Sequence, residues 1–437
     1  MNMNGPASWA LITSAAQLGL MKRPTVASLK KLSAENLSAL GADQLADILL
    51  GVAETRPDLK RRLRMEVVAE QGPEHLVPQI DKRLATLQTS RGQVSWRQKP
   101  AVVRDVDALR ELIGESLAAM DRSAALERMW LFMETASPVG RRFQDRDSAI
   151  AAVYARAAAD LGRLLAGHDR QMAANSLVEA VVARPQAWAE WLPQTLAGLP
   201  KATAEIALGL ALERRERTPG WLTVIRHLAD AAGDVEAFRQ TYSEEGLATP
   251  AVAVDLARRY LAAGDVEAAG DVLRLAAPRP GRAGRLAAPD FDWESAWIDY
   301  LEQSGDEATA QAVRWASFER TLDVDRARAF TRRLDGFDDV EAESRALAHA
   351  AAYPDFALGL RFLMTWPALA EASRMIEARP DDIKVEGEEA ELWAAKLRRR
   401  FPAAAHLLLR RAAAAAFRRR EFKVCDRLTQ EAETIVV

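Results

Sequence analysis

The chain has 437 residues, a net charge of −3, 49% hydrophobic residues and 28% charged residues. It is too long for a single small core, and its composition is ordinary for a soluble globular protein. The single cysteine, Cys425, excludes a disulfide within the chain and a zinc site built on cysteines, and it favours a reducing, cytoplasmic setting.

Alanine is abundant, glycine is scarce, and β-branched and aromatic residues never form alternating runs. This pattern predicts helix along nearly the whole chain. Residues 9–21 are apolar, but they lack the preceding basic residues of a signal peptide and are too short to span a bilayer, so we expect no membrane association. Met21 resembles an alternative start, and residues 1–20 are interpreted as an N-terminal extension, with an ordinary first helix as the alternative.

Residues 21–170 are predicted to form a basic N-terminal helical module. Ser33 is expected to cap a short first helix, and Asp43 to begin the next one. Apolar residues at helical spacing in this second helix predict a buried stripe of Leu45, Ile48, Leu49 and Val52. Further helices follow, and a polar stretch at residues 89–100 separates them into two groups.

Residues 171–437 are predicted to form a tetratricopeptide-like helical-repeat domain. Gly-Asp dipeptides recur at Gly233-Asp234, Gly264-Asp265 and Gly305-Asp306, at intervals close to the period of helix-turn-helix repeats but not constant. The middle dipeptide joins two predicted helices within residues 250–278. Their expected buried faces consist of Leu256, Ala257, Tyr260 and Leu261 in the first helix and Ala269, Leu273 and Ala276 in the second.

Neither of these helices is long or apolar enough to be stable alone, so each must pack on its partner and on a neighbouring pair. The predicted fold class is therefore all-α, an α-solenoid of stacked antiparallel helix pairs resembling degenerate tetratricopeptide or HEAT repeats. Ordinary helical hairpins are the alternative interpretation of the same pattern.

The sequence contains no recognised catalytic motif. It has no glycine-rich phosphate loop that ends in Gly-Lys-Ser/Thr and no Gly-x-Ser-x-Gly elbow. The five histidines are scattered singly, and the acidic pairs lie at predicted turns, where aspartate caps helices. We therefore expect no enzyme activity, cofactor or metal site, although a site assembled from residues distant in the sequence remains an alternative.

Basic residues concentrate near the N-terminus, since residues 1–104 carry more basic than acidic side chains and the remainder shows the opposite balance. Basic groups near helix ends bind phosphates, and a tryptophan among them can stack on a base. The candidate residues for binding nucleic acid or another anion are Lys30, Lys31, Lys60, Arg61, Arg62, Arg64, Arg91, Trp96, Arg97 and Lys99. The alternative interpretation is a solvated charged face with Trp96 in the core.

Four stretches resemble an uncharacterised, all-helical family of bacterial proteins. They are LSAENLSALGADQLADILLGVAE, RRLRMEVVAE, IDKRLATLQTSRGQVSW and AVRWASFERTLDVDRARAFTRRL. The second half of the chain also resembles the helical part of bacterial proteins that carry a SWIM-type zinc finger. That finger needs several cysteines and a histidine, so its zinc function does not extend to a chain with only Cys425. The resemblance implies a cytoplasmic helical protein and brings no activity.

Two functions follow as hypotheses. The first is a non-enzymatic scaffold or adaptor that binds a macromolecular partner, most readily a protein, on the concave surface of stacked helix pairs. The second is binding of nucleic acid, specifically DNA, by the basic N-terminal module. The sequence leaves the identity of the partner and the oligomeric state open.

Overall fold

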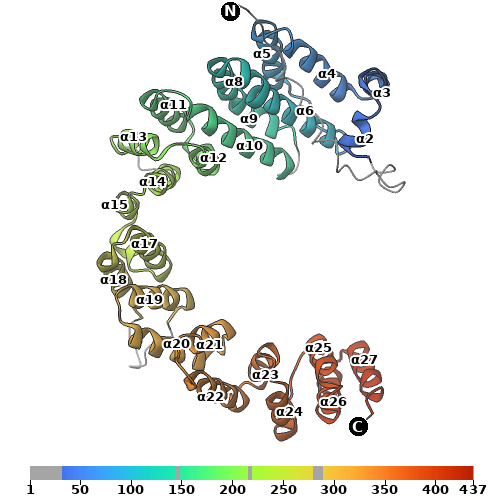
Figure 1. The fold of residues 1–437 in the computed structure, drawn as a ribbon, viewed down its shortest axis with the longest axis vertical. Helices are drawn as coiled ribbons and strands as arrows, with labels where there is room; N and C mark the ends of the chain where they lie inside the picture. The colour runs from blue at the N-terminus through green and yellow to red at the C-terminus, as the bar shows by residue number, and fades with distance from the viewer. Residues whose placement is uncertain (1–31, 144–147, 215–218, 279–288, 437) are drawn as a thin grey trace, which may run out of the picture. The chain divides into compact units, whose positions relative to one another are not determined.

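The computed structural model describes residues 32–143, 148–214, 219–278 and 289–436. Every regular element in these ranges is a helix and none is a strand, which confirms the all-α prediction (Figure 1). None of the helices described combines the length and the hydrophobicity that crossing a bilayer requires. Lys30, Lys31 and the extension predicted at residues 1–20 lie outside the described residues.

Contacts divide the chain into two compact units, residues 1–232 and residues 233–437. The helices of the first unit are α2 (Ala34–Ser38), α3 (Ala42–Thr55), α4 (Pro57–Ala69), α5 (Pro73–Thr89), α6 (Lys99–Glu111), the π-helix η1 (Leu112–Leu117), α7 (Ala118–Met120), α8 (Arg122–Glu134), α9 (Ala136–Gly140), α10 (Ser148–Leu165), α11 (Arg170–Ala183), α12 (Pro185–Ala197), α13 (Lys201–Leu212) and α14 (Pro219–Ala232).

The helices of the second unit are α15 (Val235–Arg239), α16 (Glu244–Leu247), α17 (Pro250–Ala263), α18 (Val266–Leu275), α19 (Phe291–Gln303), α20 (Glu307–Thr321), α21 (Val324–Thr331), α22 (Asp338–Ala352), α23 (Phe356–Thr365), α24 (Leu369–Ala378), the 3-10 helix η2 (Pro380–Asp382), α25 (Gly387–Leu397), α26 (Pro402–Arg418) and α27 (Phe422–Glu433). Within this unit, each helix packs chiefly on the next helix or the next but one.

The predicted division at residue 170 falls inside the first unit, because aromatic residues pack across it. The ring centroids of Tyr154 in α10 and Trp191 in α12 lie 6.5 Å apart. Trp191 in turn lies 5.6 Å from Trp188, which is fully buried and contacts Trp130 of α8. The helices on the two sides of residue 170 thus share one core.

In each Gly-Asp turn, the glycine lies at the end of one helix and the aspartate at the start of the next. Gly264 ends α17 in the left-handed conformation, with φ of 82°, which glycine adopts without steric cost. The Asp265 carboxylate then accepts a hydrogen bond of 3.0 Å from the Ala268 amide and caps α18. Asp234 and Asp306 cap α15 and α20 in the same way.

The predicted buried faces of the helix pair at residues 250–278 are confirmed. The residues predicted for α17, from Leu256 to Leu261, are all buried, as are Ala269 and Leu273 of α18 and Ala276, which follows it. Trp293 and Trp297, four residues apart in α19, stack with ring centroids separated by 5.5 Å. Apolar spacing therefore identifies the core faces of this unit correctly.

The stripe predicted as buried on α3 is a wrong prediction. Ile48, Leu49 and Val52 are 47%, 42% and 42% exposed, and the neighbouring Leu50 is 64% exposed. Leu45 is half-buried, and Ala53 is the buried residue of this helix. The physical reason is that, within the described residues, α3 packs substantially only on α2 and α4, which leaves much of its apolar surface uncovered.

Candidate functional site

A cavity of about 300 Å³ lies in the first unit where α4 packs on α5 and α6. Basic residues of α4 and α5 line one part of it, and apolar residues of α4, α6 and η1 line another. The lining residues are Arg61, Arg62, Arg64, Met65, Glu66, Gln79, Lys82, Arg83, Thr86, Asp105, Ala108, Leu109 and Leu112. The cavity thus gathers five basic side chains and two acidic ones.

Asp105 holds two of these arginines in place. Its side chain is only 8% exposed, and it accepts a hydrogen bond of 2.8 Å from Nε of Arg61 and another from Arg83. One carboxylate therefore faces two guanidinium groups and balances the charge of only one. Each arginine has five N–H donors, so both keep donors that Asp105 does not use.

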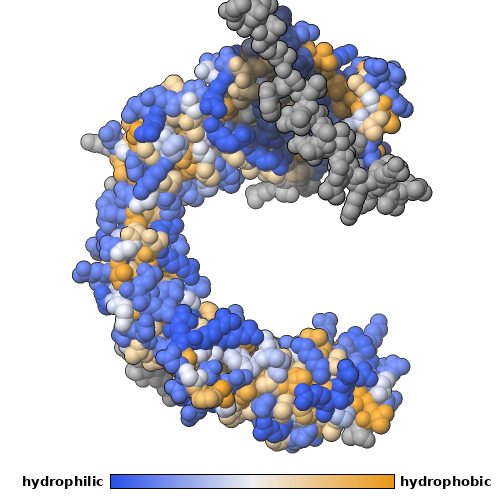
Figure 2. Space-filling view, in the orientation of Figure 1, coloured by the Kyte–Doolittle hydropathy of each residue, from blue (hydrophilic) through white to orange (hydrophobic). Residues whose placement is uncertain are grey.

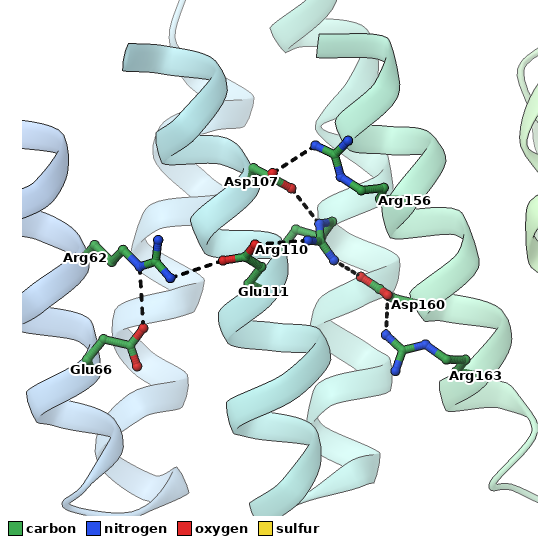
Figure 3. Close-up of polar contacts among 8 residues, drawn as sticks. All are labelled: Arg62, Glu66, Asp107, Arg110, Glu111, Arg156, Asp160 and Arg163. Carbon is green, nitrogen blue, oxygen red and sulfur yellow. Dashed lines mark hydrogen bonds and ion pairs between the residues drawn. The ribbon is translucent and has the colours of Figure 1, made fainter. Parts of the chain in front are cut away.

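Arg62 connects the cavity to an ion-pair network that crosses from α4 through α6 to α10 (Figure 3). Its guanidinium lies 3.7 Å from Glu66 and 3.3 Å from Glu111. Glu111 also contacts Arg110, at 3.4 Å. Because Glu66 and Glu111 both face Arg62, this residue is anchored rather than free to rotate.

The centre of the network is a buried ion pair between Arg110 of α6 and Asp160 of α10, whose side chains are 8% and 7% exposed. Asp107 accepts hydrogen bonds from Arg110 at 2.7 Å and from Arg156 at 2.9 Å. Burial disfavours the charged form of Asp107, but these two bonds outweigh it and hold the pKa of the carboxyl below its ordinary value. Arg163 donates a further hydrogen bond to Asp160 (Figure 3).

The π-helix η1 follows directly after Glu111, the last residue of α6, and it approaches Asp160 of α10 closely. A Cβ placed on Gly114 would lie 3.1 Å from Oδ2 of Asp160, so glycine allows the backbone of η1 to approach that carboxylate closely. Single π-helical turns are frequent at functional sites. Here the turn packs on α10, and its first residue, Leu112, lines the cavity.

The structure places the predicted site residues in two separate groups. Arg61, Arg62 and Arg64 line the cavity, and Lys60 lies on the same helix without lining it. Arg64 and Lys60 are exposed and form no ion pair within the part of the chain that the structure describes. Among the described residues, Arg61 and Arg62 are therefore paired with carboxylates and Arg64 is not, and the interpretation as a solvated charged face stays a prediction.

The second group lies in the connection between α5 and α6. Trp96 is 75% exposed, so its alternative interpretation as a core residue is wrong. The Arg97 guanidinium carbon lies 5.2 Å from the centroid of the Trp96 ring, within the range of a cation–π contact. Arg91 is exposed, and Lys99 is half-buried at the start of α6.

The connection that carries Trp96 is fixed to the body of the unit. The Val94 amide donates a hydrogen bond of 2.9 Å to the Arg142 carbonyl, and Nε of Arg142 donates one of 2.9 Å to the Gly92 carbonyl. The Val94 side chain is buried. Trp96 is thus presented to solvent by an anchored loop.

The sequence analysis missed Lys82, Arg83 and Asp105. A signal for the first two was present, because Gln79, Lys82, Arg83 and Thr86 recur at helical spacing and form a polar stripe on α5. Asp105 could not be identified, since it lies 44 residues from Arg61, which it pairs with. Across the described ranges, no three histidine, cysteine, aspartate or glutamate side chains are arranged to hold a metal ion.

The chain is similar to a known protein family over most of its length. The model of a family described as "Family of unknown function (DUF6880)" matches residues 27–203 and residues 201–434. No curated protein matches the chain.

Proposed function

We propose a function from the fold and the surface of the protein, because the chain belongs to DUF6880, a family of unknown function. Membership of this family assigns no activity to the chain. The chain is a non-enzymatic scaffold or adaptor that binds a protein partner, and its helix pairs stack as degenerate tetratricopeptide-like repeats in an α-solenoid. The stacking is supported by the second unit, where each helix packs chiefly on the next or the next but one. The recurring Gly-Asp turns support it further.

The observation that carries the proposal is the exposed apolar surface of α3, formed by Ile48, Leu49 and Val52 and called here the α3 apolar patch. These three side chains are between 42% and 47% exposed, and their helical spacing places them on one side of α3. Figure 2 shows hydrophobic residues at the surface in the region of α2 and α3. Contiguous exposed apolar surface is typical of protein-binding sites, because water contact with it is unfavourable until a partner covers it.

The first test is the double substitution Ile48→Glu and Val52→Glu in the full chain. Two buried charges at an apolar interface are expected to reduce recovery of crosslinked partner at least about tenfold. The measurement is quantitative mass spectrometry of proteins crosslinked to the purified chain in native extract. Both residues are exposed, so the fold is expected to persist, and circular dichroism checks this.

The matched control is Leu392→Glu in α25, because Leu392 is 57% exposed and lies in the other unit. This variant is expected to retain the same partner as the unchanged chain. Equal recovery with the α3 double variant and with the control would contradict the proposal, as would the absence of any specifically enriched protein.

Nucleic-acid binding is the second candidate, and the exposed Trp96 with its adjacent Arg97 is the observation that favours it. Stacking on a base contributes roughly 1–3 kcal/mol, so Trp96→Ala is expected to weaken binding of single-stranded DNA about tenfold. Fluorescence anisotropy with a labelled oligonucleotide measures this, and the affinity should fall steeply with salt. Phe337→Ala serves as the control, since Phe337 is 89% exposed in the other unit. Unchanged affinity of the Trp96 variant would exclude this candidate.

A further inference from the structure

We propose that the cavity between α4, α5 and α6 binds a small organic phosphate, that is, a dianionic phosphate group on a partly apolar body. The lining combines five basic side chains with an apolar wall in a space of about 300 Å³. This site does not depend on the partner-binding function, because it involves neither the α3 apolar patch nor the Trp96 loop.

The charges of the lining favour a dianion. Asp105 is shared between Arg61 and Arg83, so this trio carries one uncompensated positive charge. Arg64 and Lys82 also line the cavity, and neither forms an ion pair with any residue that the structure describes. Glu66 and Glu111 are both directed to Arg62. Positive charge therefore remains in excess, and a phosphate dianion would neutralise two units of it.

The donors are held in position before a ligand arrives. Arg61 uses Nε to reach Asp105, which leaves its terminal N–H groups available, and Arg83 uses one terminal nitrogen. Asp105 is itself 8% exposed, so the two guanidinium groups are fixed by a carboxylate that has little freedom to move. Planar guanidinium forks match the oxygen geometry of phosphate, and fixing them in advance reduces the entropy lost on binding.

The apolar wall indicates that the phosphate is part of a larger molecule. Met65 and Ala108 are half-buried and supply the exposed part of this wall, while Leu109 and Leu112 lie behind them and are only 4% exposed. Inorganic phosphate would leave Met65 and Ala108 in contact with water, whereas an organic body would cover them. The volume of about 300 Å³ is at the lower end of the range for small-molecule sites, which suits a ligand the size of a mononucleotide.

The experiment is isothermal titration calorimetry of the full chain with adenosine monophosphate, inorganic phosphate, succinate and a single-stranded DNA oligomer as separate probes. We expect adenosine monophosphate to bind more tightly than inorganic phosphate or succinate. Arg64→Glu and Lys82→Glu are each expected to weaken its affinity at least about tenfold, because each removes a charged donor and adds a repulsive carboxylate.

Lys60→Glu is the matched control for Arg64→Glu. Both residues are exposed on α4 without an ion pair in the described part of the chain, but only Arg64 lines the cavity. The control should change the affinity by no more than about twofold, because a charge outside the cavity is screened by salt. Ala108→Phe fills the cavity without changing its charge and should abolish binding.

Four outcomes would overturn the site. The first is that adenosine monophosphate does not bind, and the second is that Lys60→Glu and Arg64→Glu weaken its affinity equally. The third and fourth are that succinate, or inorganic phosphate, binds as tightly as adenosine monophosphate. Tighter binding of the DNA oligomer that is lost with Trp96→Ala, together with no competition from adenosine monophosphate, would assign the anion affinity to the loop instead. If Ala108→Phe fails to fold, the comparison of Arg64→Glu with Lys60→Glu decides the matter, because both positions are exposed.

Discussion

Replacing Gly162 with alanine is expected to lower the stability of the first unit by about 3 kcal/mol, because the added methyl group has no space. A Cβ on Gly162 would lie 2.1 Å from the carbonyl oxygen of Thr195 and 3.0 Å from its carbonyl carbon. Both are backbone atoms of α12, so no side chain can rotate away. The two helices would have to separate, although α10 and α12 share the aromatic contacts of Tyr154 and Trp191.

The control is Gly209→Ala in α13, where a Cβ would meet no atom within 4 Å. Alanine is the better helix former, so this variant should gain about 0.5–1 kcal/mol. Native-state hydrogen exchange of amides in α10 and α12 is the appropriate measurement, because a two-unit chain need not unfold in one step. Unchanged amide protection in the Gly162 variant would show that the two helices are not in close contact.

Local chemistry made much of the second unit predictable. Each Gly-Asp dipeptide contains both a residue suited to the left-handed end of one helix and a carboxylate that caps the next, as Gly264 and Asp265 show. Apolar residues at helical spacing, such as Leu256 and Leu273, then identify the buried faces. These signals lie within a few residues of one another, so the helix ends and the buried faces can be predicted from the local sequence.

The environment of α3 was not predictable in this way. An apolar stripe indicates that a helix face is unfavourable in water, but it does not show which element covers that face. The stripe of Ile48, Leu49 and Val52 was therefore interpreted as core and is exposed in the structure. The same spacing gave the correct answer in α17 because α18 and α19 both pack on that helix.

The candidate site was predictable only in part. Arg61, Arg62 and Arg64 attract notice because they are close together in the sequence. Lys82 and Arg83 belong to another helix, and Asp105, the carboxylate partner of Arg83, belongs to a third, so the cavity exists only once the helices pack. The π-helix η1 has no visible sequence signal, although its Gly114 lies close to Asp160 of α10.

The ion pair between Arg110 and Asp160 gives the second large expected effect. Replacing Asp160 with alanine should lower the stability of the first unit by about 3 kcal/mol, because it leaves a buried guanidinium without one of its carboxylates. Arg110 keeps Asp107 and Glu111 as partners, and this places the expected loss near the lower end for breaking a buried pair. Hydrogen exchange of the α6 and α10 amides again measures the change within this unit.

Two further variants separate the charge effect from other consequences of the substitution. Arg163→Ala removes the other arginine that contacts Asp160, but its side chain is 59% exposed, so the expected loss is less than about 1 kcal/mol. The double variant Arg110→Met and Asp160→Ala removes both buried charges and should be more stable than Asp160→Ala alone. Equal losses for Asp160→Ala and Arg163→Ala would show that the pair behaves as a surface contact. A double variant less stable than the single one would show that Arg110 packs favourably through its other partners even without Asp160.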